Sequence, residues 1–149
     1  MADYPLDELL ASYRREGDLM ALLKEAQARF GGLGPDLLDE LANGIGVPVA
    51  DLYGVVSFYS FLSTRPVGRH TIRLCQCVPC RLASADKVQT ALERELHIKP
   101  GETTPDGKFT LEMTNCIGAC GQAPAMMIDE RRFVDLSEEN IAAVLAEFD

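Results

Sequence analysis

The sequence lacks several features that would indicate common classes of protein. No apolar run approaches the ~20 residues that a membrane-spanning helix requires, and the first residues have neither the basic nor the apolar region of a signal peptide. There is no G-x-G-x-x-G or P-loop signature for nucleotide phosphates, no Ser/His/Asp set, and only two histidines, His70 and His97, which we interpret as structural. We therefore expect no direct membrane insertion. The expected location is the cytoplasm, including the cytoplasmic face of a membrane complex.

Basic residues are also scarce. The chain has 14 Lys and Arg against 23 Asp and Glu, a formal net charge of −9. An acidic surface repels nucleic-acid phosphates and anionic lipids. Residues 41–55 have the rhythm of a helix-turn-helix, but residues 48–62 contain no Lys or Arg to contact phosphates or base edges. We therefore expect no nucleic-acid partner.

Two hydrophobic patterns divide the chain. Before residue 66, apolar residues recur at helical spacing in four stretches, and Asp18 is placed to cap the second of them. We predict helices that start near Leu6, at Leu19, at Pro35 and at Val49. The third is expected to end at Asn43-Gly44 and the fourth at Leu62. The fourth is apolar around most of its circumference, which predicts burial on several sides, by its own bundle or by another subunit. These helices predict an N-terminal helical bundle over residues 1–66.

The period changes after the Arg65-Pro66-Val67-Gly68 break. Alternating apolar residues predict strands at 70–74 and 109–113 and a strand pair at 125–128 and 132–135, while helical spacing marks 84–97 and the segment after Ser137. A strand that runs into a cysteine and a helix, followed by further strands and a closing helix, is typical of a thioredoxin-like unit. The predicted fold class is α/β, with a thioredoxin-like α/β domain over residues 67–149.

All five cysteines lie in two short segments of this second domain, C75-Q-C-V-P-C80 and C116-I-G-A-C120. Thiolates bind soft metals, and iron–sulfur clusters are commonly held by four of them. The alternative is a dithiol redox pair formed by the C-x-P-C sequence of Cys77 and Cys80. That interpretation leaves three cysteines without a role, whereas a four-ligand site leaves only Cys77 over. The pattern favours a metal centre.

The spacing also bears on the kind of centre. Structural zinc sites typically use C-x2-C knuckles, and a four-iron cluster usually carries a C-x2-C-x2-C run, which is absent here. Two separated pairs suit a two-iron cluster with two thiolates per iron, and zinc remains the second interpretation. Gly118 and Gly121 would allow backbone amides to approach the sulfur atoms of a cluster.

With this pattern the sequence resembles the thioredoxin-like [2Fe–2S] ferredoxin family. Within it, the chain is similar to the E subunits of NADH–quinone oxidoreductases and to their relatives in NAD-linked and electron-bifurcating hydrogenases and NAD-linked formate dehydrogenases. The likeness covers almost the whole chain. Besides the cysteines, it includes residues 54–61, 65–70, 98–111 and 115–129.

The resemblance implies one [2Fe–2S] cluster, held by Cys75, Cys80, Cys116 and Cys120. The departure from the family pattern is Cys77, an extra thiol between two expected ligands. The resemblance further implies an electron-transfer subunit with no substrate site of its own. Its expected partners are a flavoprotein subunit that binds FMN and NAD(H) and further iron–sulfur subunits of the same complex.

Two other functions remain open on the sequence. One is a free thioredoxin-like dithiol oxidoreductase that uses Cys77 and Cys80, and the other is a stand-alone soluble ferredoxin. Iron and labile sulfide bound to the protein would separate the cluster from the dithiol. The sequence does not distinguish a subunit of a quinone reductase from a subunit of a hydrogenase or of a formate dehydrogenase.

Overall fold

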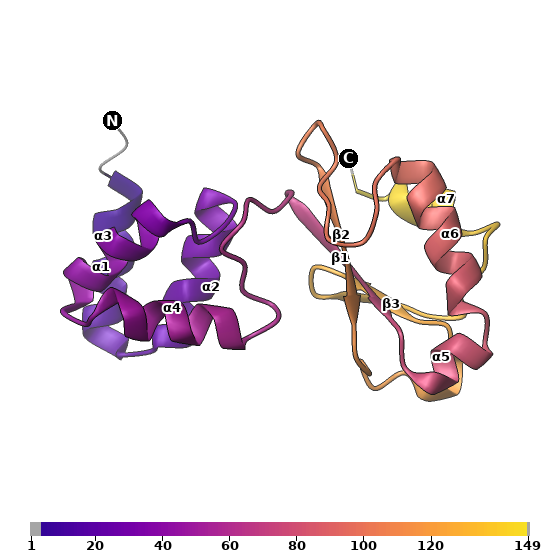
Figure 1. Ribbon diagram of the computed structural model, residues 1–149, viewed down its shortest axis with the longest axis horizontal. Coiled ribbons are helices and arrows are strands. Elements are labelled where there is room, and N and C mark those ends of the chain that lie inside the picture. The colour runs from indigo at the N-terminus through magenta and orange to yellow at the C-terminus, as the bar shows by residue number, and fades with distance from the viewer. Residues whose placement is uncertain (1–3, 149) are drawn as a thin grey trace. The chain divides into compact units, whose positions relative to one another are not determined.

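The computed structural model describes residues 4–148, which form two compact units divided between Val67 and Gly68 (Figure 1). The first unit is helical, and the second contains a sheet with helices. An N-terminal helical region followed by an α/β domain is the predicted fold class, and it is confirmed. None of the described helices is both long enough and apolar enough to cross a membrane.

The first unit consists of four helices, α1 Tyr4–Glu16, α2 Leu19–Phe30, α3 Pro35–Ile45 and α4 Val49–Phe58. The cap predicted for α2 is present, because the Asp18 carboxylate accepts a hydrogen bond of 3.0 Å from the amide of Ala21. The same helix ends at Gly31, whose positive φ of 70° forms a left-handed C-cap.

Two predicted helix ends in this unit are wrong. Helix α3 continues through Asn43-Gly44 to Ile45, because Gly44 lies inside the helix against α1, where a Cβ atom would approach the Leu10 side chain to 2.5 Å. Helix α4 ends at Phe58 instead of Leu62.

The core of the first unit is built from leucines on the inner faces of its helices, including Leu9, Leu23, Leu38, Leu41 and Leu52. Helix α4 buries Leu52 and Val56 in this core, and Val55 packs against it partly buried. Its side chains Val49, Tyr53 and Phe58 are exposed, Phe58 by 79%. The prediction that α4 is buried on several sides is therefore not met within this unit.

The second unit is organised around a four-stranded sheet with the strand order β2-β1-β3-β4. Strand β1 pairs in parallel with β2 and antiparallel with β3, which pairs antiparallel with β4. Helix α6 packs on β1 and α7 packs on α6, on the side of the sheet seen at the right of Figure 1. The elements are β1 His70–Cys75, α5 Val78–Leu82, α6 Ala85–Leu96, β2 Phe109–Thr114, the 3-10 turn η1 Cys120–Gln122, β3 Met126–Ile128, β4 Arg131–Phe133 and α7 Ile141–Leu145.

Apolar side chains of the central strands and of α6 and α7 form the core of this unit, including Ile72, Leu74, Leu92, Leu111 and Ile128. Strands β1 and β2 and the strand pair appear where the alternation predicts them. Helix α5 was not predicted. Helix α7 is shorter than expected, and its N-cap is Asn140 instead of Ser137, although Ile141 and Leu145 point inward as predicted.

Candidate metal centre

Both cysteine segments emerge from the same edge of the sheet. Strands β1 and β2 run in parallel, with Cys75 in register with Thr114, so their carboxyl ends lie side by side. The amide of Gln76 donates to the Thr114 carbonyl at 2.9 Å, so the pairing continues one residue past Cys75 and ends two residues before Cys116. Cys75 ends β1, and Cys116 follows β2 by two residues. The parallel pairing of two strands therefore brings together segments that are far apart in the sequence.

The second cysteine pair is a close contact at the surface. The Sγ atoms of Cys116 and Cys120 lie 3.3 Å apart, and both side chains are exposed. The Gly118 amide donates to Cys116 Sγ at 3.4 Å from a backbone with a φ of 78°, a conformation that favours glycine. This bond and the hydrogen bond with the Cys120 thiol lower the pKa of Cys116. The same contact between the two thiols raises the pKa of Cys120.

The first pair is buried. Cys75 and Cys80 are almost completely shielded from solvent, and they pack with Ala85, Ala119 and Ala125 in a small apolar cluster. Burial raises the pKa of the Cys80 thiol, as does its hydrogen bond with Cys75, whereas a bond from the Ala125 backbone lowers it. The Cys75 amide donates to the Ala125 carbonyl at 3.1 Å.

Sequence patterns did not identify Ala125 as a site residue. Its backbone contacts both buried cysteines. Nearly every residue type carries the same backbone amide and carbonyl, so this contact does not select a particular residue in the sequence. The only signal in the sequence was its place directly before the third strand.

Cys77 lies between the two pairs. It is the N-cap of α5 and is only partly buried. Desolvation raises the pKa of its thiol, and so do its interactions with Cys75, while the backbone of Cys116 donates to it and lowers that pKa. Cys77 thus contacts one member of each pair. All five cysteines are free thiols.

These donors fit a two-iron cluster. No three or more His, Cys, Asp or Glu side chains among residues 4–148 are grouped as ligands around a single metal ion. The thiols lie instead as one buried pair and one exposed pair, and a dinuclear cluster takes two thiolates per iron. Tetrahedral metal–thiolate bonds of about 2.3 Å place two sulfurs on one metal about 3.8 Å apart, close to the separation of Cys116 and Cys120.

Charged side chains near the centre are few. Arg73 lies on β1, two residues before Cys75. It forms an ion pair with Glu112 of the neighbouring parallel strand β2, with 3.0 Å between Nε and Oε2. Its charge is therefore already balanced by a carboxylate. The two cysteine segments themselves contain no charged residue, and Arg81 directly follows the first of them.

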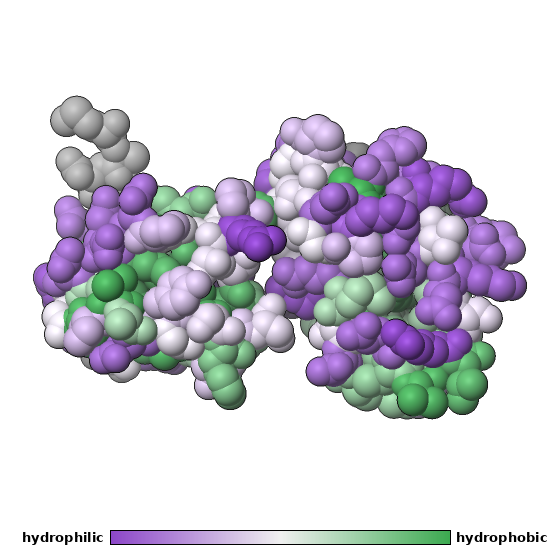
Figure 2. All heavy atoms as spheres, viewed as in Figure 1, coloured by the Kyte–Doolittle hydropathy of each residue, from purple (hydrophilic) through white to green (hydrophobic). Residues whose placement is uncertain are grey.

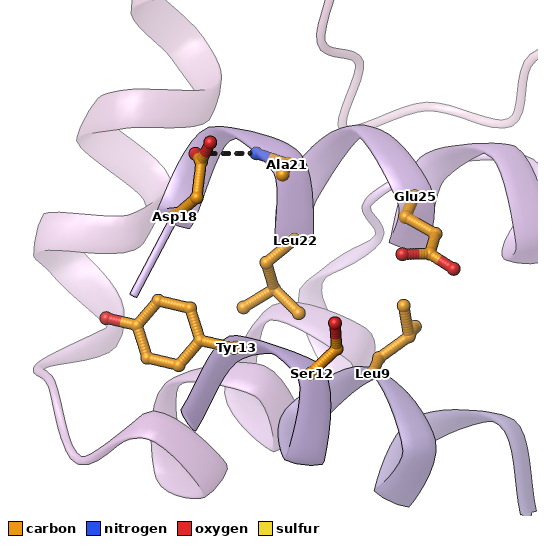
Figure 3. Close-up of a pocket in the computed structure, with 7 residues that line it drawn as sticks. All are labelled: Leu9, Ser12, Tyr13, Asp18, Ala21, Leu22 and Glu25. Carbon is orange, nitrogen blue, oxygen red and sulfur yellow. Dashed lines mark hydrogen bonds between the residues drawn. The ribbon is translucent and has the colours of Figure 1, made fainter. Parts of the chain in front are cut away.

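Two surface hollows are found among the described residues of the first unit, which contains no cysteine. The smaller, between α1 and α2, has a volume of about 50 Å³, enough for water but not for a substrate (Figure 3). It is lined by Leu9, Ser12, Tyr13, Asp18, Ala21, Leu22 and Glu25. The other hollow, of about 290 Å³, lies along the Gly31-Gly32 turn and has Asp36 as its one titratable lining residue.

The sequence matches the family model for the thioredoxin-like [2Fe-2S] ferredoxin over residues 6–149. It is 42% identical over 126 residues to the E subunit of the NADH-quinone oxidoreductase of Escherichia coli, a match that covers 85% of this chain and 76% of that protein. It is 36% identical over 135 residues to the HndA subunit of the NADP-reducing hydrogenase of Solidesulfovibrio fructosivorans, a match that covers 91% of this chain and 79% of that subunit. Subunit 2 of the NADH-quinone oxidoreductase of Thermus thermophilus is 33% identical over 145 residues, a match that covers 95% of this chain and 80% of that subunit.

A solved structure shows the same fold. A chain of an NAD+-reducing [NiFe]-hydrogenase in the air-oxidized state superposes with a TM-score of 0.72 at 26% sequence identity, covering 85% of this chain and 22% of the hydrogenase chain. The match of nearly every residue to one family model agrees with the paired thiols at the edge of the sheet. The chain belongs to the thioredoxin-like [2Fe-2S] ferredoxin family.

Proposed function

We propose that this protein is the electron-transfer subunit of an NAD(H)-linked oxidoreductase complex. It holds one [2Fe–2S] cluster on Cys75, Cys80, Cys116 and Cys120, beside a flavoprotein subunit that binds FMN and NAD(H). Further iron–sulfur subunits belong to the same complex, and substrate chemistry takes place on those partners. The relatives named for NADH–quinone oxidoreductase and for a hydrogenase support an assignment to this class of complex.

One observation carries the proposal: two thiol pairs from distant segments meet at the carboxyl edge of β1 and β2, where Cys75 and Cys80 interact with Cys120. A [2Fe–2S] cluster accepts and releases single electrons. The protein supplies two buried thiols that exclude water and two exposed thiols that face the surface. The amide of Gly118 directs a hydrogen bond at one of these sulfurs, which stabilises negative charge there.

The dithiol alternative finds no support at Cys77 and Cys80. A reactive dithiol requires a thiol with a lowered pKa that is accessible to its substrate. Here the pKa values of both Cys77 and Cys80 are raised, in each case first by desolvation, and Cys80 is buried. Both thiols interact with Cys75 instead of forming a separate pair.

The test of the ligands is a series of serine variants. Replacing Cys75, Cys80, Cys116 or Cys120 with serine should abolish or strongly alter the cluster, because a hard oxygen ligand binds iron–sulfur centres poorly. Cys77→Ser is the matched control and should retain iron, sulfide and the visible and EPR spectra. Loss of the cluster in Cys77→Ser together with its retention in Cys75→Ser would show that the ligand set is wrong.

The test of the function uses the flavoprotein subunit. When the cluster-loaded chain is mixed with that subunit under anaerobic conditions, NADH should reduce the cluster, as followed by EPR, and the chain alone should stay oxidised. A cluster that NADH cannot reduce in the mixture would contradict the proposed role. A colourless protein without iron would instead revive the dithiol alternative.

A further inference from the structure

Cys77 is the thiol that connects the two cysteine pairs. Its side chain interacts with Cys75 of the buried pair and with Cys116 of the exposed pair. It also packs against the small apolar cluster that contains Cys75 and Cys80. In the proposed ligand set, Cys77 is the one cysteine without a bond to iron, although it contacts a member of each pair.

The five thiols differ in how easily they are reached from solution. Cys75 and Cys80 are 1% and 2% exposed, whereas Cys116 and Cys120 are exposed and Cys77 is partly exposed. The reactivity of a thiol depends on its accessibility, and a buried one cannot meet a ligand-bound metal that arrives from outside. Incoming iron and sulfide therefore meet the exposed pair first. Cys77 is the most accessible thiol of the other segment.

Cys77 is also spaced to share a metal ion with Cys80. The two residues span the first turn of α5, where the Arg81 amide donates to the Cys77 carbonyl at 3.0 Å. The C-x2-C spacing is one at which two cysteines commonly bind a single metal ion. Cys75 and Cys77 are therefore alternative partners for Cys80, one of them buried and the other accessible.

Neither segment offers another strong ligand for iron. Residues 74–80 and 113–128 contain no His, Asp or Glu. Figure 2 shows hydrophobic residues gathered at the end of the second unit where α5 lies in Figure 1. The amide and hydroxyl oxygens that are present are hard ligands, which iron–sulfur centres bind poorly. An accessible third ligand beside the exposed pair is thus supplied by Cys77.

We propose that Cys77 is a transient ligand during the loading of the [2Fe–2S] cluster: it binds the incoming cluster together with Cys116 and Cys120, and Cys75 then replaces it. This inference rests on the proposed function, from which it takes the four final ligands, and it adds the route by which they are filled. In the exchange, the bond between iron and Cys77 Sγ breaks and the bond to Cys75 Sγ forms. The proton of the Cys75 thiol passes to Cys77, and no electron is transferred. Burial makes Cys75 the better final ligand, because it keeps water away from the iron.

The experiment loads the cluster-free chain under anaerobic conditions from a [2Fe–2S] cluster that is ligated by glutathione, and visible circular dichroism follows the transfer. Cys77→Ser should take up the cluster about tenfold more slowly than the unmodified chain, an effect on the scale seen for residues that support a metal site without being its ligands. It should still reach the same iron content and EPR spectrum. Val78→Ser changes the neighbouring exposed position of α5 and is the matched control, which should load at the unmodified rate.

A second variant stops the exchange at its last step. Cys75→Ser lacks the thiol that replaces Cys77, so it should load at the unmodified rate and retain Cys77 as a ligand. Its cluster should have an altered EPR spectrum and lose iron to a chelator faster than that of the unmodified chain, because Cys77 is less shielded from water than Cys75. The double variant Cys75→Ser/Cys77→Ser should hold no cluster.

Several results would overturn the inference. Loading of Cys77→Ser at the unmodified rate would do so, and so would equal slowing by Val78→Ser, which would assign the effect to the packing of α5. A Cys77→Ser chain that never acquires the cluster would make Cys77 a permanent ligand. If the unmodified chain itself takes up no cluster, the proposed function fails.

Discussion

Truncating one leucine in each unit should reveal whether the two units unfold independently. Leu74 on β1 and Leu41 on α3 are both completely buried. Replacing a buried leucine with alanine costs about 2.7–5.0 kcal/mol, with the larger values at sites that cannot collapse. Strand β1 is held on both sides by β2 and β3, so the cavity left by Leu74→Ala should persist. We expect that variant to lose about 4 kcal/mol.

Hydrogen exchange followed by mass spectrometry measures this loss in each unit separately. A loss of about 4 kcal/mol accelerates the slowest amides by roughly 10³-fold. Leu74→Ala should have this effect within residues 68–149 and leave the protected amides of α2 and α3 unchanged. Leu41→Ala is the matched control. It should accelerate hydrogen exchange in the first unit and leave the protected amides of residues 68–149 unchanged. Tyrosine fluorescence during urea unfolding gives a second measure of the first unit, because all four tyrosines precede residue 60 and the chain has no tryptophan.

Two results would refute this reasoning. Equal acceleration of both units by Leu74→Ala would show that they unfold as one cooperative body. An acceleration of less than tenfold in the second unit would show that the sheet closes around the missing side chain, and that the packing argument for the central strand is wrong.

Three further predictions concern the centre, acid stability and the partner. An EPR-monitored titration should give a one-electron midpoint of roughly −250 to −450 mV, because all-thiolate ligation gives potentials near those of plant-type ferredoxins; a midpoint above zero would contradict that ligation. The pKa of Asp106 is lowered from 3.8, first by the Thr104 hydroxyl and then by the Lys108 amide. Its stabilising contribution is therefore present above pH 3.8 and is lost as pH falls through the lower folded pKa, so Asp106→Asn should shift the urea midpoint at pH 7 but no longer at about pH 2. Deleting residues 1–62 should weaken co-purification with the flavoprotein subunit yet preserve the cluster spectrum, and unchanged co-purification would argue against docking by the helical region.

The helices and strands were predictable where one rule decides the local structure. Asp18 caps α2 because a short carboxylate at that position reaches a free amide, and this depends on neighbouring residues alone. Gly44 shows where such reasoning fails. An Asn-Gly pair usually ends a helix, but here the missing side chain makes room for Leu10 of another helix, and that contact cannot be seen in the local sequence.

The same limit applies to the centre. Spacing alone grouped Cys75 with Cys80 and Cys116 with Cys120, because short loops restrict which thiols can share a metal ion. It could not predict that the first pair is buried and the second exposed, because burial depends on how the carboxyl ends of β1 and β2 lie against Ala125 and its neighbours.

Nor could spacing identify the partner of Arg73. A free guanidinium two residues before Cys75 would stabilise added negative charge at the centre, but the parallel register places Glu112 directly beside Arg73. A paired arginine adds little net positive potential, because the carboxylate cancels most of its field beyond the immediate contact. The structure therefore removes one of the few influences that would raise the potential of the centre, and the amide of Gly118 remains as a donor to sulfur. Strand register, which no local pattern specifies, thus bears directly on the redox chemistry that the cysteines support.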